Sequence, residues 1–152
     1  MSVKIYVDAD ACPVTKLAEN IAEKFGIECT LVCDTAHKLQ SSYSQVITTS
    51  KGRDCADFFL LKLVSKDDIV VTQDYGLAAL VLSKGAYAIN QNGMEYTEFN
   101  IDGLLNSRHI GAKVRRAGGR LKGPSKRTVL EDENFKTEFI NLIEKVIKKQ
   151  TF

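Results

Sequence analysis

The sequence predicts an α/β fold in which a mostly parallel β-sheet carries helices on both of its faces. Three observations support this prediction. Short apolar runs alternate with segments of helical periodicity from Val3 to Ile89. The first run, the helix after it and the second run have the order of a β-α-β unit. Aspartates follow directly after two of the runs, at the edge where open parallel sheets bind ligands.

The first β-α-β unit is the most clearly marked part of the chain. Val3–Val7 reads as a buried strand, and apolar residues then recur at helical spacing as far as Phe25. Pro13 occupies a first-turn position and Gly26 provides the stop. A second strand is expected at Ile27–Cys33. The crossover between the two strands should be right-handed, which makes them parallel.

The middle of the chain continues this alternation. Further strands, the first of them weak, are expected at Val46–Ile47, Ile69–Val71 and Tyr87–Ile89. Between them, residues 54–65 read as a helix with one apolar face, formed by Ala56, Phe59, Leu60, Leu63 and Val64. The next helix contains Leu77, Leu80 and Val81 and ends near Gly85.

The pattern weakens after Asn90. A short helix is expected around Ile101, Leu104 and Leu105. Segment 108–127 is basic and rich in glycine, which predicts a loop or hairpin. A final amphipathic helix is expected at about 134–149, with acidic residues before it and lysines near its end, as the helix dipole favours. We expect residues 1–152 to form a single domain.

The composition is that of an ordinary globular protein, with 44% apolar and 26% charged residues. No apolar run approaches the ~18 residues that span a bilayer, so no membrane partner is expected. The start of the chain lacks the apolar core of a signal peptide, which predicts a cytoplasmic protein. The four cysteines are then expected to be thiols.

The net charge of +2 conceals an uneven distribution of charge. Residues 108–127 contain eight Lys and Arg residues and no Asp or Glu. Without these eight, thirteen basic residues face nineteen acidic ones, so the rest of the chain carries a net charge of −6. Most charged runs are simply solvated surfaces. An unbroken basic segment beside an acidic body instead favours a polyanionic partner bridged by metal.

Acidic residues recur where the predicted sheet should have its ligand-binding edge. Asp8 and Asp10 follow the first strand, and Asp74 follows the fourth. Asp54 and Asp57 open the helix between the third and fourth strands, one turn apart and therefore on one face. Asp34, after the second strand, is a weaker candidate.

Such carboxylates are suited to Mg²⁺ or Mn²⁺, which prefer oxygen ligands. Two ions ~3.5–4 Å apart could stabilise both the attacking and the leaving oxygen of a phosphodiester displacement. We therefore expect Asp8, Asp10, Asp54, Asp57 and Asp74 to bind metal, with Asp8, Asp10 and Asp74 as the catalytic carboxylates.

Each acidic position also has a purely structural interpretation. Asp10 could favour a helix N-terminus, Asp54 and Asp57 could cap a helix, and Asp74 could form a turn. Asp8 is different, because a carboxylate directly after a buried strand is costly to desolvate without compensation.

Substrate contacts are expected mainly from basic residues. His37 lies close to the predicted acidic edge and could orient a phosphate or transfer a proton, although a lone histidine is more often structural. Cys12 could have a lowered pKa near a helix N-terminus, but a negative neighbourhood opposes this and favours a packing role. The expected substrate-binding residues are His37, Arg53, Arg115, Arg116, Lys126 and Arg127.

The spaced motifs resemble those of the YaiI/YqxD family of bacterial proteins. The matching segments are V-D-A-D-A-C-P, D-T-A-H, G-R-D-C-A-D, V-T-Q-D-Y-G-L-A and G-G-R-L-K-G-P. That family is similar to the PIN-like nucleases, which implies a Rossmann-like sheet whose carboxyl edge binds Mg²⁺ or Mn²⁺ and cleaves RNA or DNA. In this resemblance Asp8 matches the acid after the first strand and Asp74 the acid of a T-x-D motif. The second acid of D-x-D and the basic segment depart from the general PIN-like pattern.

Three functions are compatible with these residues. The first is a metal-dependent nuclease, with RNA favoured over DNA and a homo-oligomer left open. The second is a haloacid-dehalogenase-like phosphatase with Asp8 as nucleophile and Asp10 as general acid. Against it, Cys12 and Pro13 do not continue the motif as such enzymes do, and no cap domain is evident. The third is a non-catalytic RNA-binding module of the same fold.

Overall fold

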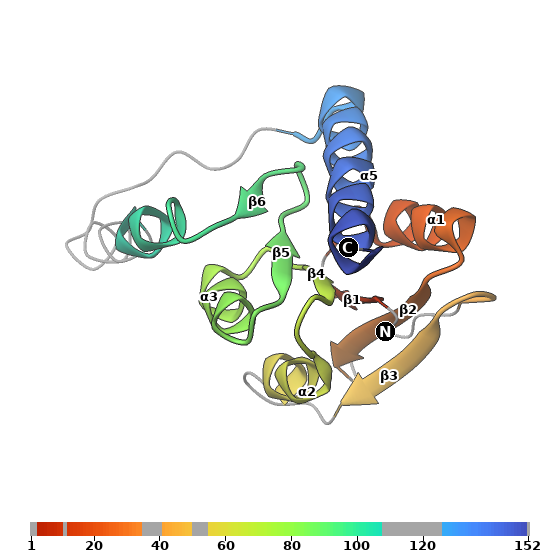
Figure 1. The fold of residues 1–152 in the computed structure, drawn as a ribbon, viewed down its shortest axis with the longest axis horizontal. Helices are drawn as coiled ribbons and strands as arrows, with labels where there is room; N and C mark the ends of the chain where they lie inside the picture. The colour runs from red at the N-terminus through yellow and green to blue at the C-terminus, as the bar shows by residue number, and fades with distance from the viewer. Residues whose placement is uncertain (1–2, 11, 35–40, 50–54, 108–125, 152) are drawn as a thin grey trace.

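In the computed structural model, which describes residues 3–10, 12–34, 41–49, 55–107 and 126–151, the strands form one sheet. Its six strands have the order β3-β2-β1-β4-β5-β6 (Figure 1). Their bounds are β1 Lys4–Asp8, β2 Glu28–Asp34, β3 Gln45–Thr49, β4 Ile69–Val71, β5 Tyr87–Ile89 and β6 Glu95–Tyr96. The first five strands are parallel, and β6 pairs antiparallel with β5. The predicted mostly parallel sheet is therefore confirmed.

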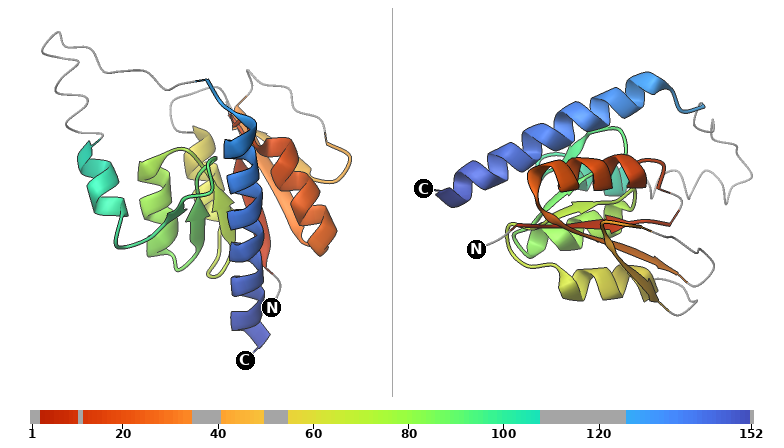
Figure 2. Two further views of the ribbon diagram at one scale, coloured as in Figure 1. Left: turned by 90° about the horizontal axis from the view of Figure 1, so that it is seen from above. Right: turned by 90° about the vertical axis from the view of Figure 1, so that its right-hand side faces the viewer.

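Helices cover both faces of this sheet (Figures 1 and 2). Their bounds are α1 Thr15–Phe25, α2 Cys55–Leu63, α3 Tyr75–Ser83 and α5 Val129–Thr151, with a further short helix at 101–107. α1 and α5 lie on one face, and α2, α3 and the short helix lie on the other. None of the helices in the described ranges is long and apolar enough to cross a membrane.

The core under α5 is built around two stacked phenylalanines. The rings of Phe135 and Phe139 lie 5.0 Å apart at 23°, and both are fully buried. They belong to the same cluster as Ile5 of β1 and Val71 of β4. Because α5 crosses the central strands, it covers the face of the sheet on which the first crossover helix also packs. α5 begins at Val129, earlier than the predicted start near residue 134.

The opposite core contains Leu60 and Val64, two of the apolar residues predicted for the helical face between the third and fourth strands. Phe59, a third member of that predicted face, is 39% exposed. The helix α2 therefore turns a narrower apolar stripe to the sheet than its sequence suggests. Tyr96 of β6 completes this core and is fully buried.

The first crossover follows the sequence closely. Gly26 adopts a left-handed conformation at φ 66° and ends α1, with its N–H bonded to the carbonyls of Ala22 and Glu23. This is the predicted role of a glycine at a helix end. Pro13 lies just before the N-cap residue Val14, so it precedes the helix rather than occupying its first turn.

The strand order creates a topological switch point between β1 and β4. From β1 the chain continues to β2 on one side, and from β4 it continues to β5 on the other. In open α/β sheets, ligands bind outside the carboxyl ends of the strands at such a point. The side chains that follow β1 and β4 are therefore the ones to inspect for function.

Candidate active site at the switch point

Asp8 and Thr72 face each other across the switch point. Asp8 is the last residue of β1, and Val7 pairs with Val71, the last residue of β4. This register brings Thr72 level with Asp8. The Thr72 hydroxyl, which is 1% exposed, donates a 2.8 Å hydrogen bond to Oδ2 of Asp8. A neutral hydroxyl thus holds a partly buried carboxylate at the carboxyl edge of the sheet.

Asp74 is held two residues beyond Thr72. Its backbone N–H donates to the Thr72 hydroxyl at 3.0 Å. Its Oδ1 accepts hydrogen bonds from the N–H groups of Gly76, at 2.8 Å, and Leu77, at 3.2 Å, and so caps α3. Asp74 therefore does have a structural role, as the sequence allows, but it caps a helix and does not form a turn. The cap also fixes the carboxylate beside Asp8.

Asp10 joins the ends of β1 and β2. Its two carboxylate oxygens accept from the backbone N–H of Asp34, at 3.2 and 3.3 Å. The N-cap of α1 is Val14, which makes no side-chain capping bond. Asp10 therefore does not cap α1, contrary to the structural interpretation of this residue. Its carboxylate binds the end of β2 instead.

The electrostatics of Asp8 show that the three carboxylates converge. The pKa of Asp8 is raised from 3.8 to about 6, chiefly by burial and also by the charges of Asp10 and Asp74, against the opposing hydrogen bond from Thr72. Carboxylates from two segments of the chain, one after β1 and one after β4, thus act on Asp8. A nearby cation would relieve this repulsion.

The residues fit a hydrated divalent cation better than a cage made by the protein alone. Among the residues that the structure describes, no three His, Cys, Asp or Glu side chains are grouped closely enough to hold an ion by themselves. Mg²⁺ usually binds one or two carboxylates and keeps several waters or substrate oxygens. Asp8, Asp10 and Asp74 offer oxygen donors of this kind, and the charges of Asp10 and Asp74 raise the pKa of Asp8.

The structure does not assign a role to the remaining predicted metal ligands or to most of the predicted substrate contacts. Asp57 lies in the first turn of α2, on a different element from the other three acids. Lys126 is exposed. The other predicted residues, His37, Arg53, Asp54, Arg115 and Arg116, lie outside the described residues. Their roles stay predictions.

Arg127 has a structural role that the sequence did not indicate. Its guanidinium donates to Asp132 Oδ1 at 2.8 Å, to Asn92 Oδ1 at 2.7 Å and to the Gln91 carbonyl at 2.6 Å. These bonds fasten the start of α5 to the turn after β5, which lies at the carboxyl edge of the sheet. A contact between Arg127 and substrate stays a prediction, but the anchor places neighbouring Lys126 at the edge that carries the acids.

Cys12 lies near this site as a packed thiol. Burial raises its pKa, and the charge of Asp8 raises it further, while Arg127 acts in the opposite direction. Burial thus outweighs the hydrogen bonds of Thr15 and Val14 at the helix start, which lower the pKa of Cys12, and this agrees with a packing role. Cys12 and Cys29 are free thiols, and the Cys33 thiol donates to the Ile47 carbonyl at 3.9 Å.

Two residues that support the site were not found from the sequence. Thr72 lies in the T-x-D motif, but only its aspartate was given a role. The second is Tyr96, whose hydroxyl donates to the Thr72 carbonyl at 3.1 Å. Tyr96 belongs to β6, a two-residue antiparallel strand without a detectable pattern.

Comparison with known proteins gives a consistent family match. Residues 6–145 match the model of a family described as uncharacterised, YaiI/YqxD. A UPF0178 protein of Clostridium acetobutylicum is 51% identical over 143 residues, which cover 93% of this chain and 97% of that protein. A UPF0178 protein of Exiguobacterium sibiricum is 49% identical over 141 residues, with 93% and 96% covered.

Among solved structures, the chain is similar to a mutant of Rae1 (YacP) from Bacillus subtilis. The sequence identity is 18% and the TM-score is 0.40, with 97% of this chain and 91% of that chain covered.

Proposed function

The chain belongs to the YaiI/YqxD family, and we propose that it is a divalent-metal-dependent nuclease that hydrolyses phosphodiester bonds in RNA or DNA. The observation that carries this proposal is the placement of Asp8 and Asp74 around the Thr72 hydroxyl at the switch point of the sheet, with Asp10 two residues after Asp8. Asp8 and Asp10 follow β1 and Asp74 follows β4, and each accepts hydrogen bonds from neutral groups. Held carboxylates that repel one another favour a cation-binding role over a purely structural one.

The three carboxylates have distinct tasks in this proposal. A bound Mg²⁺ or Mn²⁺ ion would stabilise the negative charge of a phosphodiester and make water a stronger nucleophile. Asp8 is fixed by the Thr72 hydroxyl and is the central ligand. Asp10 and Asp74 flank it and bind the ion directly or through its waters. The hydrogen bonds to Asp34 N–H and to the start of α3 orient these two carboxylates before any ion arrives.

Nucleic acid is the substrate that the charge distribution favours. The basic segment 108–127 ends at Lys126 and Arg127, and Arg127 is anchored at the carboxyl edge. Lysines and arginines near the acids would bind the phosphate backbone and bring it to the cation without reading its sequence. We favour RNA over DNA as the substrate, with His37, Arg53, Arg115 and Arg116 as further contacts.

A single-turnover cleavage assay tests the proposal. Labelled single-stranded RNA and DNA are incubated with the protein in Mn²⁺ or in EDTA, and Asp8→Asn is compared with Asp102→Asn. Asp102 is an exposed acid on the helix at 101–107, so its replacement removes the same charge away from the site. We expect Mn²⁺-dependent cleavage that falls at least ~100-fold in Asp8→Asn and stays unchanged in Asp102→Asn.

Two outcomes would reject the proposal. Equal cleavage by the wild type and Asp8→Asn would remove Asp8 from the chemistry. Retention of RNA in EDTA without cleavage under any condition would instead support the non-catalytic module, whose binding depends on salt and the basic segment alone.

A further inference from the structure

Tyr96 makes a buried contact with the turn that carries the acidic site. Its side chain is fully buried on β6, at the far end of the sheet order from β3. Its hydroxyl donates a 3.1 Å hydrogen bond to the carbonyl of Thr72, the first residue after β4. Because β6 is separated from β4 by β5, the phenol reaches across a neighbouring strand to make this bond.

Thr72 connects the hydroxyl of Tyr96 to the acids. Its N–H donates to the Ile89 carbonyl at 3.0 Å and continues the parallel ladder. Its hydroxyl connects Asp8 and Asp74, by donating to the first and accepting from the N–H of the second. A shift of the Thr72 backbone would therefore move both contacts together.

The ring of Tyr96 supports the other side of the same turn. It lies 6.0 Å from the ring of Tyr75, at an interplanar angle of 61°, which is an edge-to-face arrangement. Tyr75 directly follows Asp74 and begins α3. The hydroxyl and the ring of Tyr96 thus hold the two ends of the turn from Thr72 to Tyr75.

We propose that Tyr96 is a positioning residue of the acidic site, which sets the separation of Asp8 and Asp74 by fixing the turn between β4 and α3. The inference rests on the proposed function where it concerns the cation. Tyr96 does not need to touch the cation or the substrate, because it acts through Thr72. It gives the added strand β6 a role in the chemistry of a site formed by β1 and β4.

Tyr6 provides a matched comparison within the same molecule. It is a buried tyrosine of the same apolar cluster, and its hydroxyl also donates to a backbone carbonyl, that of Leu63 at 3.3 Å. Leu63 ends α2, so this bond does not involve the turn that carries Asp74. Tyr6→Phe and Tyr96→Phe remove the same chemical group and the same kind of hydrogen bond, which is partly buried at Tyr6 and buried at Tyr96.

The test measures two quantities in the full chain. The first is hydrogen exchange at the Asp74 amide in the metal-free protein, followed by NMR. The second is the Kd for Mn²⁺, measured by calorimetry. We expect Tyr96→Phe to accelerate exchange at Asp74 and to weaken Mn²⁺ binding about fivefold, the effect of one lost hydrogen bond. Tyr6→Phe should leave both within twofold of the wild type, although it also loses a hydrogen bond to a backbone carbonyl.

The outcomes separate this inference from the proposed function. If the wild type binds no Mn²⁺, the proposed function fails, and exchange at Asp74 alone decides the role of Tyr96. Equal exchange rates in the wild type and Tyr96→Phe overturn the inference. Equal changes in Tyr6→Phe and Tyr96→Phe also overturn it, because they would show a general loss of stability.

Discussion

The acids at the two ends of the central strands differ in what lies next to them. At the amino ends of the strands, acids meet bases: Lys4 pairs with Glu28 at 3.5 Å, and Asp67 pairs with Lys149 at 3.4 Å. At the carboxyl ends, Asp8 accepts from a hydroxyl, and Asp10 and Asp74 raise its pKa further. Ion pairs thus stabilise the amino end, whereas at the carboxyl end neighbouring carboxylates raise the pKa of a partly buried acid.

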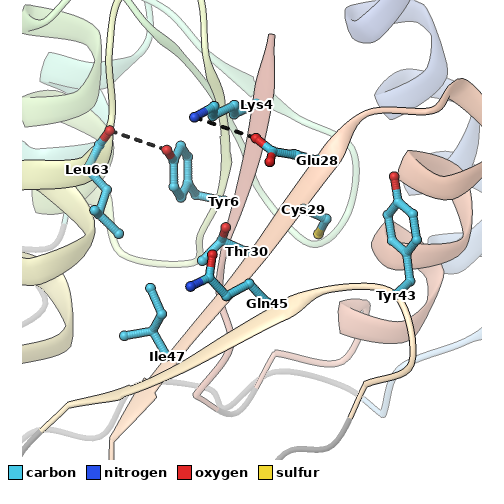
Figure 3. A pocket seen from close by; sticks show the side chains of 9 residues that line it. All are labelled: Lys4, Tyr6, Glu28, Cys29, Thr30, Tyr43, Gln45, Ile47 and Leu63. Carbon is cyan, nitrogen blue, oxygen red and sulfur yellow. Dashed lines mark hydrogen bonds and ion pairs between the residues drawn. The ribbon is translucent and has the colours of Figure 1, made fainter. Parts of the chain in front are cut away.

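Judged by the shape of the surface alone, the functional site would be placed at the amino end of the sheet. A hollow of about 380 Å³ lies at the amino end, on the face that carries Tyr6 (Figure 3). Three of its polar side chains already have partners, because the Tyr6 hydroxyl bonds to the Leu63 carbonyl and Lys4 pairs with Glu28. Volume alone does not locate function here. The charges at the switch point are the better guide.

Among the substitutions that test this comparison, the largest change in the free energy of unfolding should come from removing Asp68, a hydrogen-bonded acid at the amino end. Asp68 is 4% exposed and accepts from the N–H groups of Lys4, at 3.1 Å, and Ser65, at 2.9 Å. Asp68→Ala would leave both donors without this acceptor, so we expect a loss of about 3 kcal/mol in the free energy of unfolding. Urea denaturation measures it. A loss below about 1 kcal/mol would show that water replaces the carboxylate and that this end is less tightly built than we infer.

Removing an acid at the carboxyl end should instead raise the free energy of unfolding of the metal-free protein. The rise in the pKa of Asp8 from 3.8 to about 6 corresponds to about 3 kcal/mol. We expect about 2 kcal/mol of this to appear, because the side chain keeps some contact with water. Asp8→Asn should therefore be more stable than the wild type by about 2 kcal/mol at pH 8 in EDTA.

The pH dependence fixes the sign of that prediction. A carboxyl group whose folded-state pKa is raised contributes stability below pH 3.8, and this contribution is lost as the pH rises through about 6. The advantage of Asp8→Asn should thus be near zero at pH 3.5 and grow until about pH 7. Denaturation at several pH values in EDTA measures it. An advantage that does not change with pH would mean that packing, not charge, explains the difference.

The smallest effect is expected from the surface pair at the amino end. The side chains of Lys4 and Glu28 are 47% and 76% exposed. Glu28→Gln should cost less than about 0.5 kcal/mol, because water and salt screen exposed ion pairs. Denaturation with and without 0.5 M salt would measure this cost. A loss above 1 kcal/mol that disappears in salt would give this pair a larger share of the stability than we assign to it.

The sequence predicted the elements whose pattern is local. Ile69–Val71 and Tyr87–Ile89 are strands with the predicted bounds, and Gly26 ends α1 as expected. Apolar runs and a left-handed glycine act within a few residues, so they can be read directly. Asp8 and Asp74 were also placed correctly at one edge, because parallel strands share their carboxyl ends.

What the sequence did not predict depends on contacts between distant segments. β6 has two residues and exists because it pairs with β5, so it has no period of its own. Asp10 bonds to Asp34, a partner 24 residues away that no spacing rule identifies. Tyr96 reaches Thr72 across the same number of residues. In each case tertiary packing, rather than local propensity, decides the outcome.

The place of α5 in the chain has a consequence for synthesis. Its 23 residues follow every strand of the sheet, yet Phe135, Phe139 and Ile143 are fully buried against the face of β1 and β4. A chain that emerges from the ribosome N-terminus first would have all its strands available while that face is still bare. Until α5 follows, the nascent chain exposes an apolar surface to its surroundings, so a pause before α5 is the moment at which a chaperone would be most useful.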